Sequence, residues 1–367
     1  MKKTDILIAV LIAILAVPAL FSCKKNTEET IPSLAGSIYS YVPPYVERGD
    51  AFTVKASGIY AYEDDAEIVY RIKVDTVQTE YVTFDPEAGF RVELGEDEAN
   101  FPNGAYTVYI LASAEGYYST SAAYQFNIIE PGMTGDSSLT GLGIDPEDSD
   151  KIEADGEDYY FKQIGSGCWL RHNLAVTAPA SEYEAEGYEK DPSIPVEEPI
   201  FGGVYYCCSV MGDILGRYYT YEEAMQACPS GWHLPTEAEW AALAIEAGAE
   251  DKTYETGESF KGVAGSLKAL ASLNGLRLWE FWPQSEASDK LGFAALPSGY
   301  SVRIPGGDGR SDSFFCITEY ATFWTADEYG NDSTKAWYRF ITDTGSDMYA
   351  ALADKSSFGA SVRCVKD

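Results

Sequence analysis

Histidine and basic residues are scarce in this chain of 367 residues. It contains 2 histidines, and 26 lysines and arginines stand against 58 aspartates and glutamates, which gives a net charge of −32. Surfaces that bind nucleic acid or anionic membranes need basic patches, so this composition excludes both as partners of the protein surface. The two histidines, His172 and His233, also leave few candidates for a catalytic base or a metal ligand, and we expect both to be structural.

Long apolar runs are missing after the N-terminus. Lys2 and Lys3 precede an apolar run, residues 6–20, of about 15 residues, which is shorter than the ~20 that a membrane-spanning helix needs. The run ends at Leu20-Phe21-Ser22-Cys23. This arrangement resembles a bacterial lipoprotein signal, which implies removal of residues 1–22 and lipidation of Cys23. Ordinary secretion, with an incidental Cys23, is the alternative.

No aspartate follows Cys23 that would indicate retention in an inner membrane; Lys24 stands there instead. We therefore expect a lipid-anchored protein of the outer membrane that is exposed at the cell surface. Its membrane contact would come from the lipid alone, with residues 23–33 as a tether.

Cysteine is absent between the lipidation position and residue 168. The other cysteines are Cys168, Cys207, Cys208, Cys228, Cys316 and Cys364. An even number of cysteines in an exported chain indicates disulfides, and six of them allow 15 pairings. The pattern alone does not choose among these pairings.

Residues 34–129 read as an all-β domain. Alternating apolar residues predict strands at 52–56, 68–74, 81–84, 90–94, 106–112 and 124–128, separated by turn residues. This number of short strands predicts an immunoglobulin-like β-sandwich, whose simplest role is that of a spacer. Residues 130–158, rich in glycine and acidic residues, are expected to form a linker.

From residue 159 onward the pattern changes to α+β. Thr220 with Glu223 and Thr236 with Glu239 each have the spacing of a capping box, so each predicts a helix start. Short strands are expected around them, at 160–164, 169–170, 293–296, 322–324, 337–341 and 361–365, with short strands or turns at 203–206 and 217–219. Residues 301–313 are expected to form a long irregular loop.

Six segments in this region have a distinctive order. They are WLRHNL (169–174), GVYYC (203–207), ACPSGWHLPTEAEW (227–240), ATFWTADE (321–328), AWYRF (336–340) and FGASVRCVKD (358–367). Together they resemble the Fibrobacter succinogenes major paralogous domain. The resemblance implies a C-type-lectin-like fold over residues 159–367, in the branch that includes formylglycine-generating enzymes. It also implies a disulfide between Cys228 and Cys364.

Lectin-like folds carry a long loop region, which would fall here between residues 262 and 321. Aromatic rings stack on sugars and polar side chains bond to hydroxyls, so the candidate ligand-binding residues of this region are Trp279, Trp282, Arg303, Asp308, Arg310 and Asp312. The alternative is that the two tryptophans anchor the loop. The calcium-binding motifs of lectins, Glu-Pro-Asn and Trp-Asn-Asp, do not occur, so we expect neither a metal nor another cofactor.

The most economical interpretation is a non-catalytic, adhesin-like protein that binds a glycan or a protein ligand at the cell surface. An alternative is a fimbrial tip or accessory subunit, with pilus subunits as partners. A third is an enzyme of the formylglycine-generating branch, which uses two closely spaced cysteines late in the domain. Apart from Cys364, only Cys316 lies there, which argues against that activity.

Overall fold

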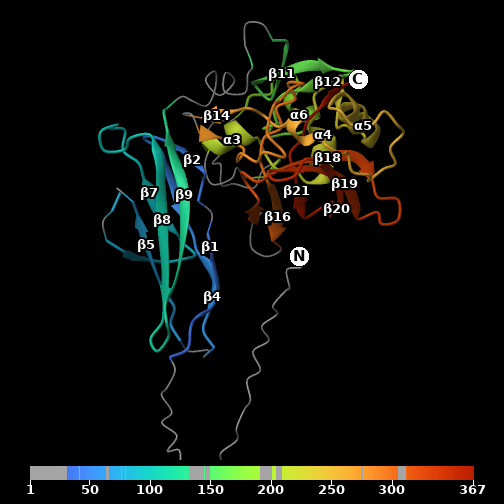
Figure 1. Ribbon diagram of the computed structural model, residues 1–367. Helices are drawn as coiled ribbons and strands as arrows, with labels where there is room; N and C mark the ends of the chain where they lie inside the picture. Colours follow the sequence, from blue (N-terminus) through green and yellow to red (C-terminus); the bar gives the residue numbers. More distant parts are fainter. Residues whose placement is uncertain are drawn as a thin grey trace, which may run out of the picture.

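The computed structural model describes residues 31–40, 42–62, 66–75, 77–78, 80–131, 144, 149–190, 201–203, 209–273, 276–304 and 311–367. An N-terminal β-sandwich lies beside a larger C-terminal domain that mixes strands and short helices (Figure 1). Within this part of the chain, no helix has the length and apolar character needed to cross a membrane. The lipidation candidate Cys23 and the vicinal pair Cys207-Cys208 lie outside the described residues.

In its described residues, the N-terminal domain contains nine strands in three sheets. The main sheet has the order β2-β9-β8-β5-β6, and two further pairs are β3–β7 and β1–β4. All pairings are antiparallel except that of β2 with β9. The strands are β1 (Ala35–Tyr39), β2 (Tyr45–Glu47), β3 (Ala51–Val54), β4 (Ser57–Tyr60), β5 (Val69–Val74), β6 (Val82–Phe84), β7 (Phe90–Glu93), β8 (Gly104–Ser113) and β9 (Thr120–Ile129).

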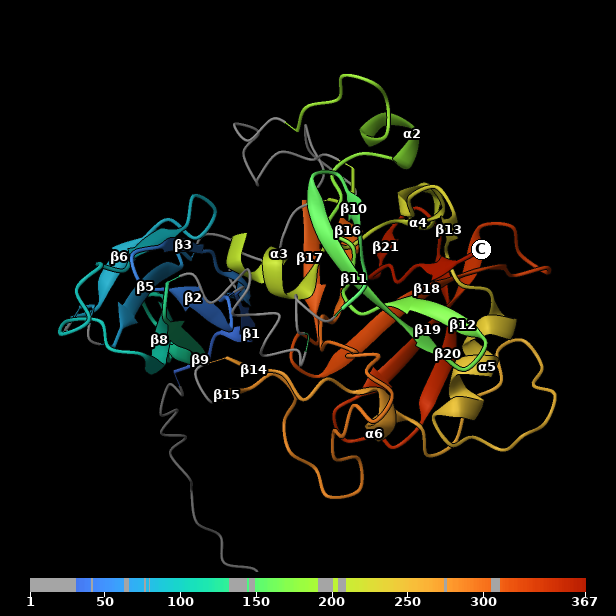
Figure 2. The same cartoon turned by 90° about the horizontal axis from the view of Figure 1, so that it is seen from above.

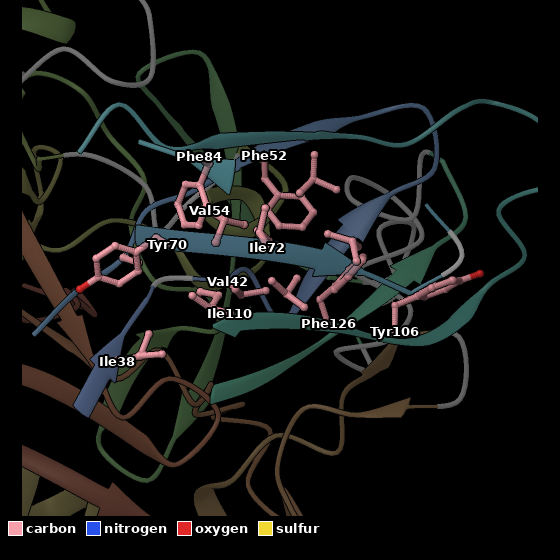
Figure 3. Packing of buried hydrophobic residues seen from close by; sticks show 14 of the residues in the cluster. Ile38, Val42, Phe52, Val54, Tyr70, Ile72, Phe84, Tyr106, Ile110 and Phe126 are labelled. Atoms are coloured by element: carbon pink, nitrogen blue, oxygen red, sulfur yellow. The ribbon is translucent and has the colours of Figure 1, made fainter. Parts of the chain in front are cut away.

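The core of this domain follows from the period-two alternation of its strands. Every second residue of β5, such as Ile72, is buried against Phe52 and Val54 of the opposing pair (Figure 3). The rings of Phe52 and Phe126 meet edge to face at 5.2 Å. All six predicted strands are confirmed, while β1, β2 and β4 went unpredicted because they are short and contain glycine or few apolar residues.

The C-terminal domain is organised around a five-stranded sheet of order β10-β11-β12-β22-β13. The last strand of the chain, β22, thus pairs between strands from two earlier parts of the domain. The strands of this sheet are β10 (Lys151–Ala154), β11 (Glu157–Ile164), β12 (Gly167–Leu170), β13 (Trp232–His233) and β22 (Val365–Lys366). The strands predicted at 160–164 and 169–170 are confirmed. Of the strand predicted at 361–365, only the last residue, Val365, belongs to β22.

Three smaller sheets complete the domain. One contains β18 (Tyr320–Glu328), β19 (Lys335–Thr342) and β20 (Met348–Asp354), and a second contains β17 (Ser311–Phe315), β16 (Tyr300–Ile304) and β21 (Phe358–Gly359). The third is the short ribbon of β14 (Ser272–Leu273) and β15 (Leu276–Arg277). The predictions for 322–324 and 337–341 are confirmed. The strand predicted at 293–296 is wrong, because this buried segment forms only an isolated bridge, at Ala295. The segment 217–219, expected to be a strand or a turn, forms one isolated bridge between Tyr219 and Ala360. Most of the segment expected at 203–206 lies outside the described residues.

Five short helices of the described part of the chain pack around these sheets. They are α2 (Ala180–Tyr183), α3 (Ser209–Leu215), α4 (Tyr221–Ala227), α5 (Glu237–Glu246) and α6 (Ala264–Leu267). Both capping boxes are confirmed, since the Thr220 and Thr236 side chains accept from the N3 backbone and the N3 glutamates bond back. Cys228 is the C-cap of α4, and its disulfide to Cys364 is confirmed, with Cα atoms 5.8 Å apart.

Two predicted irregular segments turn out to contain hairpins. The end of the expected linker forms β10 and the start of β11, joined by Asp155 and Gly156, which both have positive φ. Such a two-residue turn matches the twist of a hairpin. The expected loop at 301–313 contains β16 and β17 in register, because Tyr300, Val302 and Ile304 alternate in the sequence as strand residues do.

The two domains share a layer of buried side chains at their junction. Tyr45 and Ile129 of the sandwich belong to the same apolar cluster as Leu215 of α3 and Leu278 of the C-terminal domain. The hydroxyl of Tyr45 donates to the carbonyl of Arg277 at 3.2 Å. Both views place α3 and β14 next to the sandwich (Figures 1 and 2). The sandwich therefore contacts the loop region in which the ligand site was predicted.

Candidate ligand-binding groove

A small groove opens in the predicted loop region, beside the β14–β15 ribbon. Its volume is about 80 Å³, and its lining residues are Ala269, Leu270, Ala271, Arg277, Trp279, Glu280, Phe281 and Ala287. Pockets that enclose a whole small molecule have volumes of about 300–1,000 Å³. This groove is too small for such a ligand, and it fits one sugar unit or one side chain of a larger molecule that lies across the surface.

Trp279 forms the inner wall of the groove. Its side chain is 3% exposed, and its Nε1 donates to the carbonyl of Ala295 at 2.8 Å. An indole that is buried and hydrogen-bonded in this way fixes the backbone around it. The expectation that Trp279 stacks on a ligand is therefore corrected: its ring is buried and anchors the loop, although Trp279 is among the residues that line the groove.

Lys268 lies behind this wall as a buried cation. Its Nζ donates to the carbonyl oxygens of Ser285 at 3.1 Å and Asp343 at 2.8 Å, and lies 5.1 Å from the centre of the Trp279 ring. Burial lowers the pKa of Lys268 to about 8, because an ammonium group is poorly solvated there. The ammonium group thus ties the loop that ends at Ser285 to the turn after β19.

The rim of the groove is aromatic and charged. Phe281 and Leu270, which line the groove, are 52% and 59% exposed. Trp282 follows Phe281 in the chain and is 37% exposed. The guanidinium of Arg277 lies 5.5 Å from the centre of the Phe281 ring, and the side chain of Glu280 is exposed beside them. Large apolar side chains that are exposed beside a firmly held segment, here the one fixed by Trp279 and Lys268, are typical of a binding surface.

The other predicted site residues do not join this groove. Arg303 is half-buried on β16, and it lies opposite Asp312 of β17 in the strand register. Neither residue is among those that line the groove. Asp308 and Arg310 lie outside the described residues. The predicted set therefore splits, with Trp279 and Trp282 at the groove loop and Arg303 and Asp312 elsewhere.

Arg363 is a site-forming residue that the sequence reading missed. It is completely buried, and its guanidinium donates to the carbonyls of Phe293 and Ala294, both at 2.6 Å, and to Asn173 at 2.7 Å. It therefore holds the segment whose next residue, Ala295, accepts the Trp279 hydrogen bond. A single arginine in the apolar stretch before Cys364 was the available signal.

Both histidines have structural surroundings. His233 bonds to Asp367 at 2.6 Å and to Glu239 at 2.9 Å, which links the chain end to the capping box of α5. His172 stacks on Tyr160, and its pKa is lowered to about 3 by burial and by Arg363. Such a histidine stays neutral and is a very weak base.

The surroundings of Cys316 do not activate its thiol. Burial raises the pKa of the Cys316 thiol, so less of the nucleophilic thiolate forms at neutral pH. Among the residues that the structure describes, no three histidine, cysteine, aspartate or glutamate side chains are grouped as metal ligands.

These observations define a class of protein: a β-rich chain of two joined domains, the second closed by a long-range disulfide and carrying an aromatic groove in its loops. The chain belongs to the Fibrobacter succinogenes major domain family, whose model matches residues 163–366. The match runs from β11 to β22 and so includes the disulfide, Arg363 and the groove. No curated protein matches the chain.

Proposed function

We propose that this protein is a lipid-anchored cell-surface lipoprotein that binds a glycan or a protein ligand without catalysis, through Phe281 and Arg277 at the groove rim and the neighbouring Trp282. The observation that carries the proposal is that exposed aromatic side chains lie next to Trp279, whose buried hydrogen bond fixes the loop. Because the hydrogen bonds of Trp279 and Lys268 hold the loop that carries these rings, less backbone ordering is required when a ligand binds.

We also propose that the N-terminal domain is an immunoglobulin-like sandwich and that the C-terminal domain is lectin-like, and details of the fold support both. In the sandwich, Tyr106 near the start of β8 donates its hydroxyl to the carbonyl of Pro102 at 2.6 Å. This is the contact of a tyrosine corner, which is a hallmark of immunoglobulin-like sandwiches. The strand order β9-β8-β5 also corresponds to the G-F-C sheet of that fold.

The lectin-like assignment of the C-terminal domain has independent support. The final strand β22 pairs between β12 and β13 in the main sheet, and the neighbouring Cys364 is joined to the end of α4. Helices α4 and α5 precede a long region of loops and short strands, which ends at β18. The disulfide and the long loop region are features that the family resemblance implied.

A glycan ligand agrees with the chemistry of the rim better than a charged macromolecule does. Arg277 and Glu280 place one cation and one anion beside the rings, so the rim has hydrogen-bonding groups of both kinds and no strong charge of one sign. Aromatic faces contact the apolar face of a sugar ring, while these side chains reach its hydroxyls.

A glycan array tests the proposal directly. The chain from residue 23 to 367, with Cys23→Ser to prevent lipidation, is compared with Phe281→Ala and Trp282→Ala. The matched control is Phe315→Ala, since Phe315 is 42% exposed on β17 in the same domain. We expect binding to a defined glycan set that both rim variants lose and the control retains. An empty array, or equal binding by all variants, contradicts the glycan proposal.

Two alternatives make different predictions in parallel assays. Co-purification with sheared pili, independent of the rim residues, would favour a fimbrial tip or accessory subunit. Copper-dependent thiol oxidation that is lost in Cys316→Ser would favour the formylglycine-generating branch. The raised pKa of Cys316 and the absence of a metal-ligand cluster in the described residues give the enzyme the weaker support.

A further inference from the structure

The sandwich carries an aromatic surface of its own, on the side formed by the β1–β4 ribbon. Tyr39, Tyr60 and Tyr62 are 63%, 57% and 73% exposed. Ile38 and Ile59, the residues before the first two tyrosines, pack into the sandwich core. Because neighbouring strand residues point to opposite faces, Tyr39 and Tyr60 share the solvent face of the ribbon. We call these three residues the tyrosine platform.

Glycines set the position of the platform rings. Gly58 has φ of +88°, and a Cβ atom built on it would lie 2.3 Å from the Tyr39 ring. The Tyr39 ring thus occupies the space that any other side chain at residue 58 would need. Gly36, on the other strand of the ribbon, has φ of +86°, and a Cβ atom built on it would lie 3.3 Å from the Tyr60 ring. Each ring therefore has one part against the backbone while most of its surface stays open.

Buried tyrosines hold the ribbon to the main sheet. The hydroxyl of Tyr124 on β9 donates to the carbonyl of Ile38 at 2.5 Å. The hydroxyl of Tyr70 on β5 is hydrogen-bonded to the backbone of Ile59. Each bond lies next to a platform residue in the sequence, so the rings stand on a fixed backbone, and little ordering is required when a ligand binds.

The chemistry of the ribbon selects an uncharged ligand. Strands β1 and β4, with sequences AGSIY and SGIY, contain no acidic or basic residue, and Ser37 and Ser57 are exposed between the tyrosines. Tyr62 is followed in the sequence by Glu63-Asp64-Asp65 in a chain with a net charge of −32, which disfavours an anionic partner. Rings and hydroxyls without charge are suited to the alternating apolar faces and hydroxyls of a neutral polysaccharide.

We infer that the tyrosine platform is a second ligand site, which binds a neutral polysaccharide. The sandwich is then a binding module, in addition to its position as the domain between the membrane anchor and the C-terminal domain. This inference does not depend on the groove, because the two sites lie on different domains and share no residue.

Affinity electrophoresis tests this inference on the whole chain with Cys23→Ser. Gels contain one soluble neutral polysaccharide each (laminarin, yeast mannan, soluble starch or galactomannan), with pectin and hyaluronan as anionic probes. We expect retardation by at least one neutral probe and by neither anionic one. Tyr39→Ala and Tyr60→Ala should each weaken that binding about tenfold, as truncation of a central aromatic does at other interfaces.

Three comparison variants separate stacking from folding. Tyr60→Phe keeps the ring and should retain binding. Tyr81→Ala removes a tyrosine that is 42% exposed elsewhere on the sandwich and should also retain it. Trp282→Ala should retain platform binding even if groove binding is lost, so the two proposals fail separately. No retardation by any neutral probe, or equal retardation of Tyr39→Ala, Tyr60→Ala and the starting protein, overturns the inference, as does platform-dependent binding to phosphatidylcholine vesicles alone.

Discussion

Loss of the Cys228–Cys364 disulfide is predicted to destabilise the C-terminal domain strongly. The two cysteines are 136 residues apart in the sequence. The chain-entropy relation for a loop of that length gives roughly 17 cal/mol/K, or about 5 kcal/mol at 25 °C. Because whole domains are stable by about 5–15 kcal/mol, removal of the bridge should leave the domain close to unfolding.

The perturbation is the double variant Cys228→Ala/Cys364→Ala, which leaves no new unpaired thiol from the bridge. Urea unfolding followed by tryptophan fluorescence, with linear extrapolation, measures the change in unfolding free energy. The controls are Cys168→Ser and Cys316→Ser, which change thiols outside the bridge. A loss below about 1 kcal/mol in the double variant, equal to that of a control, would refute the idea that the disulfide closes the domain.

Three further changes probe the anchors described above. Lys268→Met leaves the carbonyls it bonds unpaired, and each buried unpaired group costs about 1–3 kcal/mol, so urea unfolding should show that loss together with weaker groove binding. Tyr106→Phe removes the tyrosine-corner hydrogen bond and should cost about 0.5–1.5 kcal/mol in thermal unfolding. His233→Gln tests pH dependence. Burial lowers the pKa of His233, but the bonds to Asp367 and Glu239 outweigh it and raise the pKa above 6.5. Protonated His233, bonded to the two carboxylates, therefore stabilises the folded chain below pH 6.5. This stabilisation is lost as the pH rises through the folded-state pKa. Stability should fall more steeply from pH 6 to 8.5 in the starting protein than in His233→Gln, by less than about 1 kcal/mol because the pair is partly exposed.

Each of these changes has a matched contrary outcome. Unchanged stability in Lys268→Met would mean that its carbonyl contacts do not hold the groove loop. A Tyr106→Phe chain as stable as the original would remove the tyrosine corner as support for the sandwich assignment. Parallel pH profiles for His233→Gln and the starting protein would show that the histidine carries no linked proton.

Local signals in the sequence were sufficient where a short pattern dictates a structure. Thr220 and Thr236 identified two helix starts, because a capping box satisfies backbone groups within four residues. The family resemblance supplied the pairing of Cys228 with Cys364, which cysteine counting left open. The turn Asp155-Gly156 also carried a hairpin signal, but the surrounding acidic residues led to the prediction of a linker.

The groove could be predicted only in part, because burial depends on contacts between distant segments. Trp279 and Trp282 lie in one aromatic segment, and nothing in that segment distinguishes the buried ring of Trp279 from the exposed ring of Trp282. The difference arises from Ala295, which accepts the hydrogen bond of Trp279, and from Lys268 behind it. The tyrosine platform was hidden for a related reason, since its rings are placed by glycines on the neighbouring strand.

The central claim is that the exposed rings of the groove rim bind the ligand. The most direct measurement is the dissociation constant, by isothermal titration calorimetry, of the best glycan or protein ligand for the starting protein, the Phe281→Ala/Trp282→Ala variant and Phe315→Ala. Loss of two central aromatic contacts should weaken binding at least about tenfold, while the control should stay within about twofold. Equal dissociation constants for all three proteins, with folding intact, would contradict the claim.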